Sequence, residues 1–495
     1  MDLSAVRKRS GRVWSTARSI AGRIEFGTRP VDPRTRAALR ERWNALPAGV
    51  RTPSQTLGRH AVGCEGTHGV FPKCNFTCTP CYHSADANKV RIDGEHTLRE
   101  VAAQMQHFVA RRGPRAHAQL IGGEVSLLAP GDHAAALTVM REHGREPMAF
   151  THGDFDYDYL RAVVVGGNGR RRFDRVSYAV HFDKLMRGRR GIPRPRSEAE
   201  LHPYRRRFAE MFARLEREHG VSSYLAHNMT VTPDNIDDVA EVAATVVAMD
   251  GYSMLSFQPA AFVGDDRRWR GDYREIDIDT VWVNIEHGMG QEISHDAIQF
   301  GDPRCNRTAL GFMVGRTWHP FVDVSKSAEV EARDQFFTHL GGMNFGGTPP
   351  AVLVLKLLRV LVGYPRGAGV AVRWARSAVR RCGGLGRLSV ACARRQVRPM
   401  TFVVHRFMDA ENVAPAWEMM VSGRTASDPV LLETQERLAA CTYSMAHPET
   451  GELVPACVQH SVLDPDENKQ LRTLLPLTPA GSRSPGCCQP GPVNS

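Results

Sequence analysis

Three cysteines stand close together early in the chain, in the segment Cys74-Asn-Phe-Thr-Cys78-Thr-Pro-Cys81. Three residues separate the first pair and two separate the second, so a short loop must bring the three thiols to one centre. A structural zinc ion takes four protein ligands, and a fourth cysteine at matching spacing is missing. A four-iron cluster normally takes four thiolates, so three would leave one iron open to an external ligand.

The three thiols by themselves leave two other hypotheses open. They could bind zinc together with a distant histidine or cysteine. They could also hold an electron-transfer cluster whose fourth thiolate is remote in the sequence. A second motif, Gly122-Gly123-Glu124, follows an apolar, strand-like segment at residues 118–121. Taken alone, this glycine pair indicates an ordinary turn between a strand and a helix.

The cysteine spacing and the Gly-Gly-Glu motif, in this order, resemble the signature of the radical S-adenosylmethionine (SAM) superfamily over residues 64–261. The resemblance implies that Cys74, Cys78 and Cys81 bind a [4Fe–4S] cluster, with SAM on the open iron. It further implies that Gly122, Gly123 and Glu124 help to bind SAM. Reductive cleavage of SAM would then yield a 5′-deoxyadenosyl radical that takes hydrogen from a substrate, with flavodoxin or ferredoxin as electron donor. The chain departs from many members at Pro80, where they carry an aromatic residue, and Tyr82 follows the third cysteine instead.

Strand-like and helical segments alternate over residues 63–261, which predicts a parallel sheet with helical crossovers. We expect strands ending at Phe71, Ile121 and Phe150, and at residues 176–180, 228–231 and 255–257. We expect helices at residues 97–110, 134–143, 157–165, 198–219 and 235–249. Six such units match the partial (β/α)6, TIM-like barrel that the resemblance implies.

Polar side chains follow several of the predicted strands, where the chemistry of such barrels is found. The resemblance implies that these positions hold SAM or the substrate, and we assign Ser177, Asp183 and Asn228 to cofactor binding. For any one of these residues a capping or packing role is the alternative. The other polar residues in these positions are His152, Asp154, His181, Thr230 and Gln258.

Two regions outside the predicted barrel are strongly basic. Residues 1–50 contain eleven Arg and Lys and four acidic residues, which suits either a contact with a membrane or polyanion or a solvated helix. Residues 351–362 are apolar apart from Lys356 and Arg359, and are too short to span a bilayer that needs about 20 residues. Together with the arginine-rich residues 373–395, they could lie on a membrane or cover a hydrophobic substrate. The alternative is a buried helix with a solvated basic neighbour.

Another set of thiols lies near the C-terminus. Cys441 and Cys457 flank a predicted hairpin that resembles the auxiliary-cluster domains of radical SAM enzymes, and with Cys305 they are candidate ligands of a further iron–sulfur cluster. His460 and Cys64 are candidate companions, and free buried cysteines are the alternative. The order of features is most similar to the tetraether-synthase and pterin-methylating branches.

The sequence as a whole predicts an α/β enzyme with several segments. These are a basic helical extension at residues 1–60, the barrel at 61–262, a connecting region at 263–348, a basic amphipathic segment at 349–400, an α+β C-terminal domain at 401–476 and a disordered tail at 477–495. Net charge is +11, yet the basic stretches lack a known recognition motif, so nucleic acid is not an expected partner.

No secretory pattern opens the chain, so the cytoplasm is the expected compartment, with peripheral membrane contact left open. The substrate could be a small metabolite or lipid-like, and the reaction a methylation or the formation of a carbon–carbon bond. A non-catalytic iron–sulfur electron carrier or redox sensor is the alternative to an enzyme.

Overall fold

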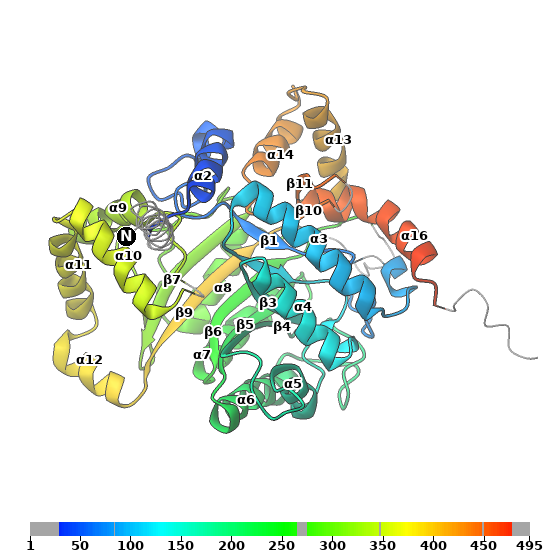
Figure 1. The fold of residues 1–495 in the computed structure, drawn as a ribbon, viewed down its shortest axis with the longest axis horizontal. Coiled ribbons are helices and arrows are strands. Elements are labelled where there is room, and N and C mark those ends of the chain that lie inside the picture. The colour runs from blue at the N-terminus through cyan, green and yellow to red at the C-terminus, as the bar shows by residue number, and fades with distance from the viewer. Residues whose placement is uncertain (1–28, 84, 265–274, 346–347, 448–449, 478–495) are drawn as a thin grey trace, which may run out of the picture.

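A large sheet runs through the middle of the molecule, in a computed structural model that describes residues 29–83, 85–264, 275–345, 348–447 and 450–477 (Figure 1). Within these ranges the sheet has eleven strands in the order β11-β10-β1-β2-β3-β4-β5-β6-β9-β7-β8. Its first six strands are β1 (Cys64–Gly66), β2 (Ala116–Leu120), β3 (Arg145–Thr151), β4 (Arg175–His181), β5 (Ser222–Val231) and β6 (Tyr252–Pro259).

These six strands lie side by side in chain order, and every neighbouring pair is parallel. Parallel neighbours require crossover connections, and helices supply them between consecutive strands. Side chains of these helices and strands share one buried core. The helices are α3 (Gly94–Arg112), α4 (Pro130–Glu142), α5 (Tyr157–Val164), α6 (His202–His219), α7 (Val239–Ala248) and α8 (Ile278–Met289).

The alternation predicted from the sequence is therefore confirmed as a mixed α/β fold with a mostly parallel sheet. The first strand was placed wrongly: the buried chain bends at residues 69–71 instead of forming a strand, and β1 lies earlier, at Cys64–Gly66. Glu65 stands in the middle of this strand, and a charged residue there hides a short strand from any hydrophobic pattern. Among the described strands β11 and β8 form free edges, so the sheet is open.

Later parts of the chain extend the same sheet at both sides. Strand β9 (Val397–His405) inserts between β6 and β7 (Asn306–Val314), parallel to the first and antiparallel to the second. On the other side β10 (Tyr443–Ala446) pairs with β1, and β11 (Leu453–Pro455) returns antiparallel to it. The hairpin predicted between Cys441 and Cys457 is thus confirmed. Strand β8 (Thr317–Pro320) completes the β7 edge.

The remaining helices lie outside the six-unit core. Of the basic N-terminal extension, the described part contains α2 (Pro33–Ala45), capped by the Asp32 side chain, whereas residues 1–28 and the predicted tail from 478 onward lie outside the described ranges. None of the described helices is long and apolar enough to cross a bilayer. The others are α9 (Ser327–Leu340), α10 (Pro350–Gly363), α11 (Gly367–Arg381), α12 (Gly384–Ala393), α13 (Ala410–Val421), α14 (Pro429–Ala439), α15 (Ala456–Val458) and α16 (Asp464–Leu474).

A buried ion pair joins β1 to β3. Arg145 Nε donates to Glu65 Oε2 at 2.9 Å and Nη2 donates to Oε1 at 3.1 Å, and neither side chain is exposed to solvent. Arg145 Nη1 also donates at 2.8 Å to the carbonyl of Gly113, which directly follows α3. The guanidinium group therefore bonds both to β1 and to the end of α3. Each charge depends on the other, because an isolated charge in this position would be severely desolvated.

Replacing Glu65 with glutamine should therefore destabilise the fold by about 3–5 kcal/mol, because Arg145 would keep its charge without a buried counter-charge. Chemical denaturation followed by circular dichroism measures this change. Glu331→Gln is the matched control, since Glu331 pairs with Arg373 on the surface and its loss should cost within about 1 kcal/mol. Equal stability of the Glu65 and Glu331 variants would contradict the role of the buried pair.

Candidate functional site

A cavity lies at the carboxyl ends of the parallel strands, and it contains about 1080 Å³ of space, part of it open to solvent. The cavity collects residues from the cysteine loop, the Gly-Gly-Glu motif and the ends of β3, β4, β5 and β6. Its lining includes Cys74, Phe76, Cys78, Pro80, Cys81, Tyr82, His83, Gly122, Gly123, Glu124, Thr151, His152, His181, Asp183, Met186, Thr230, Gln258 and Phe407.

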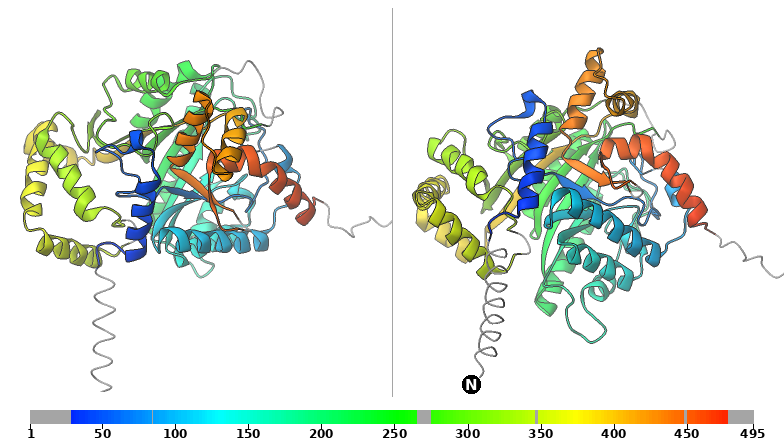
Figure 2. Two further views of the ribbon diagram at one scale, coloured as in Figure 1. Left: turned by 90° about the horizontal axis from the view of Figure 1, so that it is seen from above. Right: turned by 45° about the horizontal axis from the view of Figure 1, so that its top comes forward.

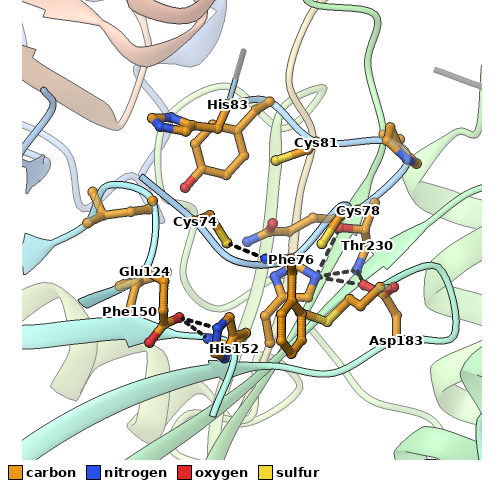
Figure 3. Close-up of a pocket in the computed structure, with 18 of the residues that line it drawn as sticks. Cys74, Phe76, Cys78, Cys81, His83, Glu124, Phe150, His152, Asp183 and Thr230 are labelled. Atoms are coloured by element: carbon orange, nitrogen blue, oxygen red, sulfur yellow. Dashed lines mark hydrogen bonds and ion pairs between the residues drawn. The ribbon is translucent and has the colours of Figure 1, made fainter. Parts of the chain in front are cut away.

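The three thiols of the cysteine loop lie around the same space, above Glu124, His152 and Asp183 (Figure 3). The Phe76 amide donates to Cys74 Sγ at 3.4 Å, and such a bond favours the thiolate that a metal requires. The Cys74 amide donates in turn to Asn88 Oδ1 at 2.8 Å, which fixes the start of the loop.

The glycine pair packs directly against the cysteine loop. The Gly123 amide donates to the Phe71 carbonyl at 2.8 Å, and the Glu124 amide donates to the Lys73 carbonyl at 2.9 Å. A Cβ atom at Gly123 would lie 2.2 Å from the Lys73 carbonyl oxygen, and one at Gly122 would lie 2.9 Å from the Phe71 ring. Glycine is therefore required here because the loop that carries Cys74 approaches so closely.

Glu124 is buried and its carboxylate is held by three donors. The Ser126 amide and the Thr151 hydroxyl donate to Oε1 at 2.9 and 2.7 Å, and the His152 amide donates to Oε2 at 2.8 Å. The side chain thus ties the end of β2 to the end of β3. Its position on the cavity wall is set by the protein's own hydrogen bonds.

His152 forms the floor of the cavity near the first cysteine. Its ring stacks on Phe76 with a centroid distance of 3.8 Å and an angle of 10°. The Asp154 amide donates to Nδ1 at 3.0 Å, so Nε2 carries the proton and donates to Asn75 Oδ1 at 2.8 Å. Burial lowers the pKa of His152, which favours the neutral ring.

A second polar group stands on the β4–β5 side. His181 Nε2 lies 2.8 Å from Asp183 Oδ2 and 3.0 Å from the Thr230 hydroxyl, and all three residues line the cavity. The Thr230 amide donates between His181 Nε2, at 3.2 Å, and the same Asp183 oxygen, at 3.3 Å. The His181 ring therefore lies between the buried Asp183 carboxylate and the Thr230 hydroxyl. The arrangement can bind polar groups of a ligand and can move a proton.

The C-terminal half of the chain closes one side of the cavity. Phe407, just after β9, lines the cavity with Pro80 and Tyr82. The Tyr82 ring lies 6.3 Å from Phe407 and 4.6 Å from His460, centroid to centroid. Desolvation raises the pKa of Tyr82, so the wall beside Cys81 is apolar and uncharged.

Two of the residues assigned to cofactor binding lie away from this cavity. Ser177 lines a second cavity near the opposite ends of the strands, together with residues such as Cys64, Arg115 and Phe345. Asn228 is buried within β5, and its backbone carbonyl accepts from the Phe182 amide at 3.1 Å. Asp183, by contrast, reaches the first cavity as expected.

The late cysteines approach one another although they are far apart in sequence. Cys64, Cys305 and Cys457 each lie within electrostatic range of Cys441. Burial raises the pKa of Cys305 to about 11 and that of Cys64 to about 11, which favours neutral thiols. Arg437 Nε donates to Cys305 Sγ at 3.2 Å.

The described residues contain no group of three or more His, Cys, Asp or Glu side chains that could hold a metal ion. Ligands of one ion must lie within about 2.3 Å of it, whereas a cluster spreads its thiolates over different irons. Soft thiolate donors around one cavity suit an iron–sulfur cluster. The donor set of Cys74, Cys78 and Cys81 therefore fits that group.

Several residues of the cavity were not found from the sequence. Phe407 was missed because β9 lies about 140 residues after its neighbour β6, and alternation at residues 397–405 is the signal that could have located it. Phe76 and Thr151 were missed because their roles, stacking under His152 and bonding to Glu124, depend on a neighbouring element.

Comparison with known proteins gives partial structural matches. No protein-family model matches the chain, and no curated protein matches it. SuiB of Streptococcus suis is 11% identical over 45% of each chain, with a TM-score of 0.31. Native anSMEcpe with bound AdoMet is 15% identical over 45% of this chain and 58% of the other, also at 0.31. The same protein with AdoMet and a Cp18Cys peptide gives 14% identity at 0.31. The chain thus spans about half the length of the structures it matches.

The close contact at Gly123 yields a direct test. Gly123→Ala should lower the melting temperature of the metal-free protein, because the added Cβ must push the Lys73 backbone away, at a cost of about 1–3 kcal/mol. Gly131→Ala is the matched control, since a Cβ there meets open space at the start of α4. If both variants melt at the wild-type temperature, the glycine is not needed for docking the cysteine loop.

Proposed function

We propose that the chain is a radical SAM enzyme. The observation that carries this proposal is the convergence of the cysteine loop, the Gly-Gly-Glu turn and the polar ends of four strands on one cavity. These elements are separated by up to about 180 residues in the sequence, and a structural zinc site would not require the shared cavity. A partial barrel around this cavity belongs to the same proposal.

Cys74, Cys78 and Cys81 would hold a [4Fe–4S] cluster, and SAM would bind beside it against the Gly122–Gly123 backbone. A bound, reduced cluster would supply one electron for the cleavage of SAM into methionine and a 5′-deoxyadenosyl radical, and that radical would take hydrogen from the substrate. The protein's part is to position the reactants and to exclude water. Phe407 and Tyr82 provide an apolar wall for this, while His181, Asp183 and Thr230 provide polar contacts for SAM or the substrate.

The cavity combines apolar and polar lining, which suits a small metabolite or the end of a lipid-like molecule. An electron donor such as flavodoxin or ferredoxin would reduce the cluster, and an oxygen-sensitive cluster would operate in the reducing cytoplasm. A further cluster on Cys305, Cys441 and Cys457 stays a prediction. It would be established if the wild type held more than four iron atoms per chain and Cys441→Ala lost the excess.

Cys78→Ala tests the central assignment. After anaerobic reconstitution, this variant should lose the [4Fe–4S] absorption and electron paramagnetic resonance signals, and it should form no 5′-deoxyadenosine from SAM under dithionite. Cys392→Ala is the matched control, because Cys392 is exposed on α12 and should leave both properties unchanged. A wild-type cluster that never produces 5′-deoxyadenosine would instead indicate an electron carrier or redox sensor.

Glu124→Gln separates SAM binding from cluster assembly. The amide can accept from Ser126 and Thr151 but loses the negative charge that holds the His152 backbone, so the Gly122–Gly123 turn should loosen. We expect a full iron content and a SAM dissociation constant raised about tenfold, equivalent to about 1.4 kcal/mol. Isothermal titration calorimetry of the reconstituted protein measures this dissociation constant. An unchanged constant would show that SAM binding does not depend on Glu124.

A further inference from the structure

Helix α10 is the most apolar helix on the surface of the described chain. Its sequence is Pro-Ala-Val-Leu-Val-Leu-Lys-Leu-Leu-Arg-Val-Leu-Val-Gly, and none of its residues is buried. Val354, Leu358 and Val362 are exposed by 54%, 52% and 83%, and Leu355 and Leu361 are also exposed. These five residues recur every three or four positions, so they form one apolar face along the helix. Clusters of exposed apolar side chains of this kind mark contact surfaces.

The helix is anchored at its ends, and its apolar face is left outside. The Tyr364 ring, just after α10, stacks on His339 of α9 with a centroid distance of 4.1 Å. Before its first turn, Arg115 Nη1 donates to the Thr348 hydroxyl at 3.4 Å. Both views in Figure 2 show α10, α11 and α12 as a yellow arm at one side of the molecule, away from α13, α14 and α16. Within the described ranges, the arm therefore leaves the apolar face of α10 exposed.

The arm is also strongly basic. Residues 350–395, which contain its three helices, include ten Lys and Arg and no Asp or Glu. Arg373 and Arg381 pair with Glu331 and Glu329 of α9, so part of the charge is neutralised. In the described structure no ion pair is formed by the exposed side chains Arg366, Arg376, Arg380, Arg387, Arg394 and Arg395. Leu385 and Val390 of α12 add exposed apolar groups among these cations.

We infer that this arm docks onto an anionic lipid bilayer, with the α10 apolar face in the boundary between headgroups and acyl chains. Exposed leucines and valines beside unpaired arginines are the composition of interfacial helices that bind anionic lipids. A nucleic acid would match the arginines but leave the leucines in water. A second copy of the chain would match the leucines but bring two basic arms together, which like charges oppose.

The dimensions of α10 agree with a position in the plane of the membrane surface. Its 14 residues give a length of about 21 Å at 1.5 Å per residue, shorter than the hydrocarbon core of about 30 Å. The second cavity opens near the start of this helix, because Asn344, Phe345 and Arg115 line it and Arg115 bonds to Thr348. Docking would therefore bring that cavity toward the lipid surface. The inference does not depend on the cluster or on SAM.

Vesicle sedimentation with the full chain tests the inference. The wild-type protein should bind vesicles of phosphatidylcholine mixed with phosphatidylglycerol, and bind phosphatidylcholine alone at least tenfold more weakly. Leu355→Asp/Leu358→Asp should weaken binding to the anionic vesicles by about tenfold or more, since two exposed apolar contacts are lost. Arg376→Glu/Arg380→Glu should weaken it as well and reduce its salt dependence.

Val421→Asp/Val430→Asp is the matched control, because these exposed valines lie on α13 and α14 and the change in charge is the same. It should bind as the wild type does. The inference is overturned if the wild type ignores anionic vesicles, if the α10 variant binds like the wild type, or if the control loses as much affinity. It is also overturned if light scattering shows a wild-type dimer that the α10 variant converts to a monomer. Formation of 5′-deoxyadenosine in the absence of vesicles reports separately on the proposed enzyme.

Discussion

The docking of the cysteine loop onto the Gly122–Gly123–Glu124 turn is the constraint on which the candidate site depends. Two backbone hydrogen bonds, from Gly123 to Phe71 and from Glu124 to Lys73, join a loop without regular structure to the end of β2. The Glu124 carboxylate in turn links this turn to β3, because it accepts hydrogen bonds from Thr151 and His152. A long loop is normally the most mobile part of a fold, and here it is fastened immediately before its first cysteine.

The cavity is built from segments that are far apart in the sequence, because their strands join the same sheet. The ends of β3, β4, β5 and β6 line it, Phe407 follows β9, and His460, which contacts Tyr82, follows β11 and α15. Both C-terminal strands join the sheet beside the core strands, β9 next to β6 and β10 next to β1. The regions that the sequence suggested were separate segments therefore contribute to one sheet and to one cavity wall.

Charge is distributed unevenly over this framework. Buried charges are paired, as in Glu65 with Arg145 and Glu198 with Arg205, since unpaired charges are costly in the interior. The arm formed by α10, α11 and α12 carries most of its cations on the surface without acidic partners. Buried arginines thus stabilise the sheet, whereas the exposed arginines of the arm are placed to contact an anionic surface.

The sequence alone determined the local features: the spacing of three thiols, the glycine pair, the order of six strand–helix units and the hairpin before Cys457. These are short-range patterns, and periodicity and turn chemistry reveal them. The tertiary structure decided what depends on distant partners. It placed β1 at Glu65, whose buried charge is neutralised by Arg145 and Arg112. It also brought Phe407 to the cavity, while Ser177 lines another. It also left the apolar face of α10 outside, although its composition suited a buried helix equally well.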